Sequence, residues 1–247
     1  MYHKELARSG HWLFSIRGLN IHGAIIGAAI IAWCTGRYGP FGDGLLNVAA
    51  NCGWQVFALA IALTGAFWRV ITSGYAALGT SGNAKKEAVA AELNTTGLYS
   101  IVRNPLYTGR IINFTGIAML SGSWVFGGFV FLISVLVYER ISMYEEQFLI
   151  DKFGDEHRKW AEKIPALLPR LTGWVKPKYK FWWRRAVRRE YKKFFQLATA
   201  TILVDFARRG FTLPENLTCY YVYGAIVVWR LGMAAAHYFG KAFDDIS

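Results

Sequence analysis

The sequence contains few charged residues for its length. Only 18% of its 247 residues are Asp, Glu, Lys or Arg, below the roughly 25% typical of soluble domains, whereas 54% are hydrophobic. The apolar residues are also gathered in long runs separated by polar segments. This pattern argues against an ordinary soluble domain and favours an integral membrane protein.

Cysteines are scarce, and acidic residues are outnumbered by basic ones. The three cysteines, Cys34, Cys52 and Cys219, lie far apart and form neither zinc-ligand spacing nor a paired redox motif, so we expect no metal site. The 28 Lys and Arg residues exceed the 16 Asp and Glu residues and give a net charge of +12. Basic residues beside apolar runs are typical of membrane proteins, so we predict anionic lipid headgroups as partners and no nucleic acid.

The apolar runs predict an all-α, polytopic membrane helical bundle. A break at Ser121-Gly122-Ser123 divides the longest run into a short helical hairpin. We therefore expect six transmembrane helices, or five if the short run at 194–207, which contains Asp205, lies at the membrane surface. The runs occupy residues 19–36, 46–68, 111–138, 194–207 and 218–240.

The basic residues give this bundle a predicted orientation. With six spans, most Lys and Arg residues fall on one side, which the positive-inside rule makes cytoplasmic. The segments before and after the hairpin then share this side of the membrane. We therefore expect residues 95–110 and 140–193 to lie together at the cytoplasmic face.

Two polar motifs flank the hairpin. The first is "GLYSIVRNPLYTG" and the second is "YERISMYEEQFLIDKFGDEHRKW". Each has an ordinary explanation: Asn104 and Pro105 suit a helix start, and Glu145-Glu146 suits a solvated turn beside the membrane. A third polar segment, "GTSGNAKKE", matches neither a phosphate-binding loop nor a dinucleotide fingerprint.

Taken together, the two motifs resemble the C-terminal signature of a known family. They are similar in order and spacing to the integral-membrane methyltransferases that include isoprenylcysteine carboxyl methyltransferase and phospholipid methyltransferases. The resemblance covers residues 95–170, between an N-terminal part, 1–94, and a basic, apolar C-terminal part, 171–247. The matching positions are Gly97, Tyr99, Arg103, Asn104, Pro105, Tyr107, Gly109, Glu145, Glu146, Phe153, Gly154, Pro165 and Pro169.

The resemblance implies S-adenosyl-L-methionine as cofactor and a membrane lipid as substrate. Arg103, Asn104 and Glu146 are the implied catalytic residues. Arg103, Arg140 and Arg170 are candidates for binding the substrate headgroup, because a guanidinium binds carboxylate or phosphate in a bidentate manner. The implied cofactor-binding residues are Gly97, Tyr99, Asn104, Pro105, Tyr107, Gly109, Glu145 and Glu146.

Asn104 departs from the family pattern, which has a histidine at this position. An asparagine side chain donates and accepts hydrogen bonds but does not titrate, so it cannot be a general base. A phosphate or carboxylate oxygen needs no base, whereas a protonated amine must first lose a proton. We therefore expect O-methylation of an anionic lipid headgroup.

The regions outside the core resemble a bacterial subgroup similar to lipid A 1-phosphate methyltransferases. This resemblance implies the bacterial inner membrane, with the active site facing the cytoplasm. Three alternatives remain: carboxyl methylation of a prenylated cysteine, N-methylation of phosphatidylethanolamine, and a non-catalytic scaffold of the same fold. Candidates for attracting anionic headgroups are Lys85, Lys86, Arg184, Arg185, Arg188 and Arg189.

Overall fold

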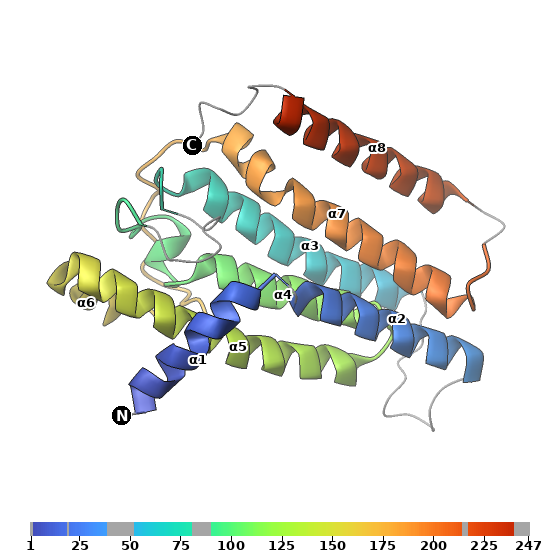
Figure 1. Cartoon of the computed structure of the whole chain (residues 1–247), viewed down its shortest axis with the longest axis horizontal. Helices are drawn as coiled ribbons and strands as arrows, with labels where there is room; N and C mark the ends of the chain where they lie inside the picture. Colours follow the sequence, from blue (N-terminus) through green and yellow to red (C-terminus); the bar gives the residue numbers. More distant parts are fainter. Residues whose placement is uncertain (1, 19, 39–51, 81–89, 214–216, 240–247) are drawn as a thin grey trace.

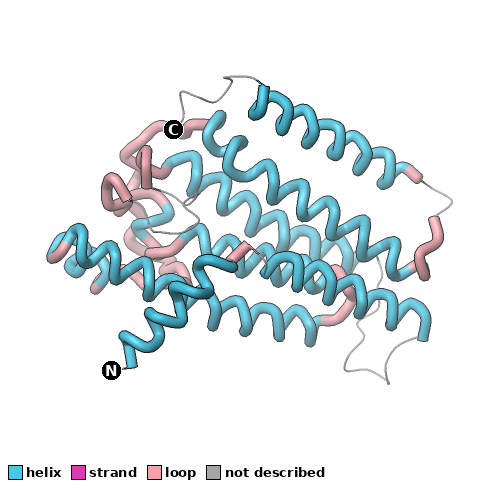
Figure 2. The backbone as a smooth tube through the Cα atoms, viewed as in Figure 1, coloured by secondary structure: helices cyan, strands magenta, loops and turns pink. Residues whose placement is uncertain are grey.

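The computed structural model describes residues 2–18, 20–38, 52–80, 90–213 and 217–239, and the regular elements in these ranges are helices (Figures 1 and 2). The predicted all-α fold is therefore confirmed. The helices are α1 (Tyr2–Ile16), α2 (Asn20–Tyr38), α3 (Cys52–Tyr75), the 3₁₀ turn η1 (Leu98–Ser100), α4 (Pro105–Met119), α5 (Trp124–Phe153), α6 (Asp155–Ala161), α7 (Trp183–Arg208) and α8 (Thr218–Phe239).

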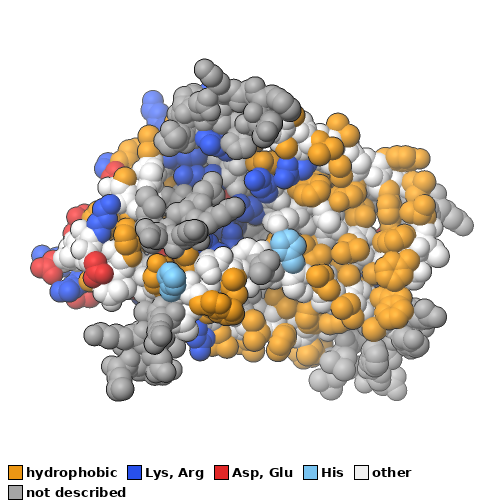
Figure 3. All heavy atoms as spheres, in the orientation of Figure 1, with side chains coloured by type: hydrophobic (Ala, Val, Ile, Leu, Met, Phe, Trp, Pro, Cys, Tyr) orange, Lys and Arg blue, Asp and Glu red, His pale blue; other side chains and the backbone are white. Residues whose placement is uncertain are grey.

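The long helices form a bundle with one polar end. Helices α2, α3, α4, α5 and α7 run lengthwise, α8 packs on α7, and α1 crosses α5 (Figure 1). Helix α6 and the loops around η1 gather at one end of the bundle. On the face shown in Figure 3, charged side chains concentrate toward this end and hydrophobic side chains cover the rest. This distribution fits a helical bundle in a membrane with its loops at a polar face.

The predicted hairpin is confirmed. Helix α4 ends at Met119, and α5 begins after Ser123, whose side-chain oxygen accepts a hydrogen bond from the Phe126 amide at 3.1 Å. Gly122 between them has φ of 90°, a conformation that glycine adopts at little cost. The turn therefore brings the start of α4 and the far part of α5 to the same end of the bundle.

Fewer helices meet the criteria for a membrane span than the five or six expected. In the described part of the chain, Gly53–Tyr75 and Trp124–Phe153 are long and apolar enough. A third candidate is the bent pair Ser9–Ile16 and Asn20–Cys34, whose axes differ by 67°. Helix α4 is too short to qualify: its 15 residues extend about 23 Å, less than the roughly 30 Å hydrocarbon core.

Helix α7 corrects the prediction for residues 194–207. This apolar run is not a separate segment, because it continues the basic stretch before it in one helix of 26 residues. Arg185, expected at the lipid surface, is 2% exposed and donates to the carbonyl oxygens of Ser73, Gly74 and Ala76. Its guanidinium therefore caps the C-terminal end of α3, where helix carbonyls lack partners.

Arg69 directly follows the apolar run 46–68 in the sequence and lies inside α3. Its Nε and Nη2 atoms both lie 2.9 Å from the carboxylate oxygens of Glu190 in α7, and Nη1 donates to the Leu106 carbonyl at 2.8 Å. The Ser73 hydroxyl donates to the same carboxylate at 3.1 Å. Only 6% of Arg69 and 2% of Glu190 are exposed, so this ion pair is a buried link between α3 and α7.

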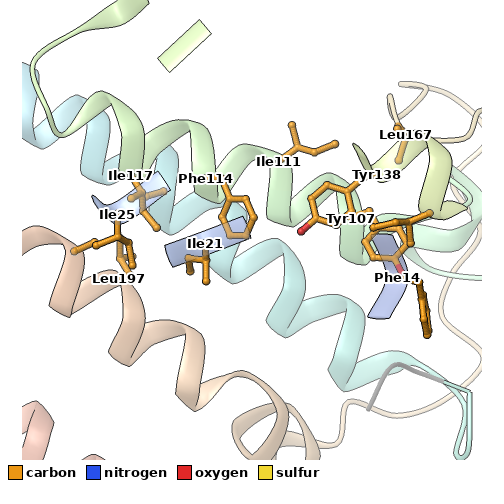
Figure 4. Close-up of a cluster of buried hydrophobic side chains, with 13 residues drawn as sticks. Phe14, Ile21, Ile25, Tyr107, Ile111, Phe114, Ile117, Tyr138, Leu167 and Leu197 are labelled. Carbon is orange, nitrogen blue, oxygen red and sulfur yellow. The ribbon is translucent and has the colours of Figure 1, made fainter. Parts of the chain in front are cut away.

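Helices α3 and α4 approach each other closely through small residues. A Cβ atom at Gly116 would lie 2.3 Å from the Ala62 nitrogen, and one at Gly65 would lie 2.4 Å from the Asn113 nitrogen. The Asn113 side chain donates to the Ala62 carbonyl at 2.8 Å across this contact. Beside it, a buried cluster joins α4 to its neighbours (Figure 4). The hairpin therefore has a fixed position on α3.

Candidate functional site

The first motif begins with a turn held by the chain beyond α6. Gly97 has φ of 62°, and its amide donates to the Val175 carbonyl at 2.9 Å. The Ser100 hydroxyl accepts from the Val175 amide at 2.9 Å. The Gly97 conformation favours glycine, which explains this residue type at the start of the motif. Residues 97–100 are thus held by hydrogen bonds to Val175, in the segment between α6 and α7.

The proline-containing segment after α6 lies along the start of α4. The amides of Arg103 and Asn104 donate to the carbonyls of Pro165 and Ala166 at 2.9 and 3.1 Å. The Thr108 hydroxyl donates to the Leu167 carbonyl at 2.7 Å. Two segments about sixty residues apart in the sequence therefore form one wall at the polar end of the bundle.

Asn104 connects this wall to α5. It occupies the N-cap position of α4, with Pro105 as the first helical residue, but its side chain makes no capping hydrogen bond. Instead, its Nδ2 atom lies 3.4 Å from Glu146 Oε1 and 3.3 Å from the Ala166 carbonyl oxygen. Arg103 Nε lies 3.2 Å from the same Glu146 oxygen. Glu146 therefore holds the two adjacent motif residues in place.

Next to this junction is a pocket that contains the other acidic residue of the pair. Glu145 lines it and interacts with the side chain of Tyr107. Tyr107 stacks on Tyr138, with ring centroids 4.9 Å apart and ring planes at 21°. Other residues of the first motif that line the pocket are Tyr99, Arg103, Asn104 and Pro105.

Two polar groups of the pocket are placed to donate hydrogen bonds to a ligand. Desolvation, and then the nearby Glu145 carboxylate, raise the pKa of the Tyr99 hydroxyl above its usual value, so this hydroxyl stays protonated at neutral pH. The Trp160 indole nitrogen is buried and has no hydrogen-bond partner within the described residues. A buried donor of this kind is costly unless a ligand or water accepts from it.

Not all the predicted site residues meet in this pocket. Glu146 lies beside it, bound to Arg103 and Asn104. Gly97 forms a turn with positive φ, and Gly109 lets α4 approach α3, because a Cβ there would lie 2.9 Å from the Gly65 carbonyl oxygen. Arg140 and Arg170 are not among the lining residues; Arg170 donates to the carbonyls of Lys163 and Ser100 at 2.9 and 3.0 Å. Most of the "GTSGNAKKE" segment, including Lys85 and Lys86, lies outside the described residues.

Several lining residues were missed by the sequence reasoning. Phe14 and Arg17 come from the end of α1 and the turn after it. No sequence motif around these two residues indicates that they belong to a binding site. Arg69 and Arg110 lie in or next to apolar runs, which is the signal that could have identified them, because charged residues there are rarely incidental. The pocket therefore includes cations from three separate helical regions.

Comparisons with known proteins agree with this geometry. Residues 54–156 match the phospholipid methyltransferase family. This matched region contains nearly all of α3, the first motif and the Glu-Glu pair. Over 102 residues, the chain is 30% identical to methanethiol S-methyltransferase 1 of Bradyrhizobium diazoefficiens, covering 41% of this chain and 30% of that protein. No solved structure gives a significant match.

Two further relatives are named for other activities than methanethiol methylation. The chain is 34% identical over 80 residues to protein-S-isoprenylcysteine O-methyltransferase of Schizosaccharomyces pombe, covering 31% of this chain and 33% of that protein. It is 31% identical over 83 residues to the nickel-cobalt-cadmium resistance protein NccN of Alcaligenes xylosoxydans xylosoxydans, covering 34% of this chain and 38% of that protein. The chain thus spans about a third of the length of these relatives.

These matches confirm, over residues 54–156, the resemblance to the integral-membrane methyltransferases. The matched region ends at the start of α6, so the proline-containing wall and the basic helix α7 lie beyond it. Helices α1 and α2 also lie outside it.

Proposed function

We propose that the protein is an S-adenosyl-L-methionine-dependent membrane methyltransferase that methylates an anionic oxygen, phosphate or carboxylate, of a lipid headgroup. The observation that carries this proposal is the meeting of the two motifs at one pocket. Asn104 Nδ2 and Glu146 Oε1 lie 3.4 Å apart although they are separated by 42 positions in the sequence. Glu145, next to that contact, lines the pocket.

The pocket residues fit the proposed cofactor. S-adenosyl-L-methionine carries a methyl group on a positively charged sulfur, together with an ammonium, a carboxylate and ribose hydroxyls. The Glu145 carboxylate can accept hydrogen bonds from the ammonium or the ribose hydroxyls of the cofactor. The Tyr99 hydroxyl and the Trp160 indole N–H can donate to its hydrogen-bond acceptors. The fit thus rests on one acidic side chain and two neutral hydrogen-bond donors that line the same pocket.

The two glutamates take different roles in this proposal. Glu145 contacts the cofactor, because it lines the pocket. Glu146 is a positioning residue, because it holds Arg103 and Asn104. Methyl transfer is a displacement in which the acceptor and the methyl group must be aligned, so these residues would act mainly through proximity and orientation.

The acceptor follows from the residue types in the pocket. The relatives named above include one named for methanethiol and one for isoprenylcysteine, so their names do not fix the acceptor of this chain. Asn104 cannot remove a proton, and no histidine is among the described lining residues. An acceptor that is already anionic needs no such group, and the basic helix α7 supports a headgroup of negative charge.

The test is to incubate the purified protein with methyl-labelled cofactor and total bacterial lipid, and then to identify the labelled lipid. Label on a phosphate- or carboxylate-bearing lipid supports the proposal. Label on phosphatidylethanolamine nitrogen, or on a prenylated cysteine peptide offered in parallel, would replace the proposed acceptor. Failure to bind the cofactor in calorimetry would favour the non-catalytic scaffold.

Replacing Glu145 by glutamine should weaken cofactor binding at least about tenfold, because hydrogen bonds to charged groups contribute about 1.5–3 kcal/mol. Titration calorimetry in detergent micelles measures this change. The matched control is Glu139→Gln, which removes an exposed carboxylate from the same helix and should leave binding unchanged. Equal affinities of the Glu145→Gln variant and the parent protein would remove Glu145 from the cofactor site.

Replacing Asn104 by histidine should preserve cofactor binding, with a change of about 1 kcal/mol or less, because imidazole can still donate to Glu146. Asn104→Leu removes the donor and should weaken binding more. Calorimetry on both variants distinguishes them. If the histidine variant loses cofactor binding as the leucine variant does, the pocket is built around the asparagine itself.

A further inference from the structure

Two of the pocket's arginines already have carboxylate partners. Arg69 is paired with Glu190 at 2.9 Å, and Arg103 with Glu146 at 3.2 Å. Their charges are therefore compensated by the protein. Arg140 and Arg170, the other arginines expected to bind a headgroup, do not line the pocket. The arginines predicted from the sequence thus leave the pocket without an obvious anion-binding group.

Arg110 is different from these residues. It lies one turn into α4, lines the pocket and is half-buried. Its Nη1 atom lies 3.4 Å from both the Arg17 carbonyl oxygen and the Tyr138 hydroxyl, which are neutral groups at the long end of hydrogen-bond distances. Within the described part of the chain, Arg110 forms no ion pair with a carboxylate.

The surroundings fix the position of this guanidinium. Tyr138 is fully buried and stacks on Tyr107, which in turn contacts Glu145. The carbonyl of Arg17, after α1, supplies the other acceptor, and α1 packs against α5 where it crosses it. The carboxylates of Glu145 and Glu190 act on this guanidinium electrostatically, but among the described residues neither forms an ion pair with it. A partly desolvated guanidinium without a directly bound carboxylate can bind an anionic ligand favourably.

We propose that Arg110 is the anion-binding residue of this site and binds a carboxylate or phosphate group of a ligand. Resting on the proposed function, two sources supply that chemistry: the carboxylate of the cofactor's amino-acid part and the headgroup phosphate of the lipid acceptor. Arg110 and Glu145 line the same pocket, so a ligand with both charges meets a partner for each. Because Arg17 lies outside the matched region 54–156, this arrangement uses a part of the chain that the family match does not cover.

The first experiment uses inorganic phosphate and does not depend on the methyltransferase activity. Thermal unfolding of the detergent-solubilised protein is measured with and without phosphate at constant ionic strength. We expect phosphate to raise the melting temperature of the parent protein and of the control Arg140→Gln, but not of Arg110→Gln. Arg110→Lys keeps the charge without the planar fork and should give an intermediate shift. Equal shifts in all variants, or none in the parent protein, would overturn the proposal.

The second experiment distinguishes the two sources. Calorimetry compares S-adenosyl-L-methionine with its decarboxylated form on the parent protein and on Arg110→Gln. If the cofactor carboxylate is the anion, the substitution weakens the intact cofactor about tenfold or more and leaves the decarboxylated form unchanged. If the acceptor phosphate is the anion, cofactor affinity is unchanged and KM for the labelled lipid rises by a similar factor.

These results also separate this inference from the proposed function. An Arg110-dependent phosphate effect without cofactor binding by the parent protein would contradict the methyltransferase and preserve the anion site. If cofactor binding and lipid labelling are the same in Arg110→Gln as in the parent protein, the methyltransferase proposal is supported and the anion site at Arg110 is contradicted.

Discussion

Replacing Glu190 by alanine should lower the free energy of unfolding by about 3–5 kcal/mol, because it leaves Arg69 as a buried charge without its counter-ion. The Ser73 hydroxyl and two guanidinium nitrogens lose their acceptor in the same step. Equilibrium unfolding in mixed micelles measures the change. Because Arg69 lines the pocket and binds the Leu106 carbonyl, cofactor affinity should fall as well.

An exposed ion pair provides the control. Arg158 and Asp155 in α6 lie 3.5 Å apart with side chains 63% and 80% exposed, so Arg158→Ala should change stability by about 0.5 kcal/mol or less. A double variant, Arg69→Met with Glu190→Leu, should be more stable than Glu190→Leu alone, because neither charge remains buried. If the double variant is instead the less stable of the two, the charge of the pair is not what links α3 to α7.

Replacing Gly116 by alanine should destabilise the protein by about 1–3 kcal/mol, because the new methyl group would lie 2.3 Å from the Ala62 nitrogen. The obstacle is the backbone of α3, so no side-chain rotation removes the overlap and the two helices must separate. The Asn113 to Ala62 hydrogen bond would lengthen in the same movement. The same unfolding measurement reports this loss.

Gly128→Ala in α5 is the matched control, since no atom of the described residues lies within 4 Å of a Cβ built there. This substitution should leave stability unchanged or raise it by up to about 1 kcal/mol through helix propensity. If both glycine variants have the same stability, close approach of α3 and α4 does not determine the position of the hairpin.

The sequence predicted the parts of the site that depend on local chemistry. The apolar runs predicted helices, and Ser121-Gly122-Ser123 predicted the hairpin that returns Pro105 and Glu145 to one end. The hairpin follows from residue types whose effects extend over only a few positions, so it could be read without tertiary information. The residue types and order of the two motifs also predicted the family resemblance that the comparisons confirm.

The division of roles within the site could not be predicted. Glu145 and Glu146 are adjacent and chemically identical, and only the rotation of α5 directs one into the pocket and the other toward Arg103 and Asn104. The basic run before residue 194 was similarly ambiguous. Its Arg185 resembles a lipid-facing residue in sequence, but packing of α7 against α3 buries it on backbone carbonyls.

The sequence by itself therefore determined the all-helical class, the hairpin and the two motifs of the methyltransferase resemblance, because these depend on hydropathy, turn chemistry and residue order. The tertiary structure alone decided which charges are compensated. Glu190 neutralises Arg69 from another helix, Glu146 neutralises Arg103, and Arg110 is left in the pocket beside Glu145. The physical reason is that an ion pair requires two side chains within about 4 Å, and for residues far apart in the chain this distance is set by helix packing.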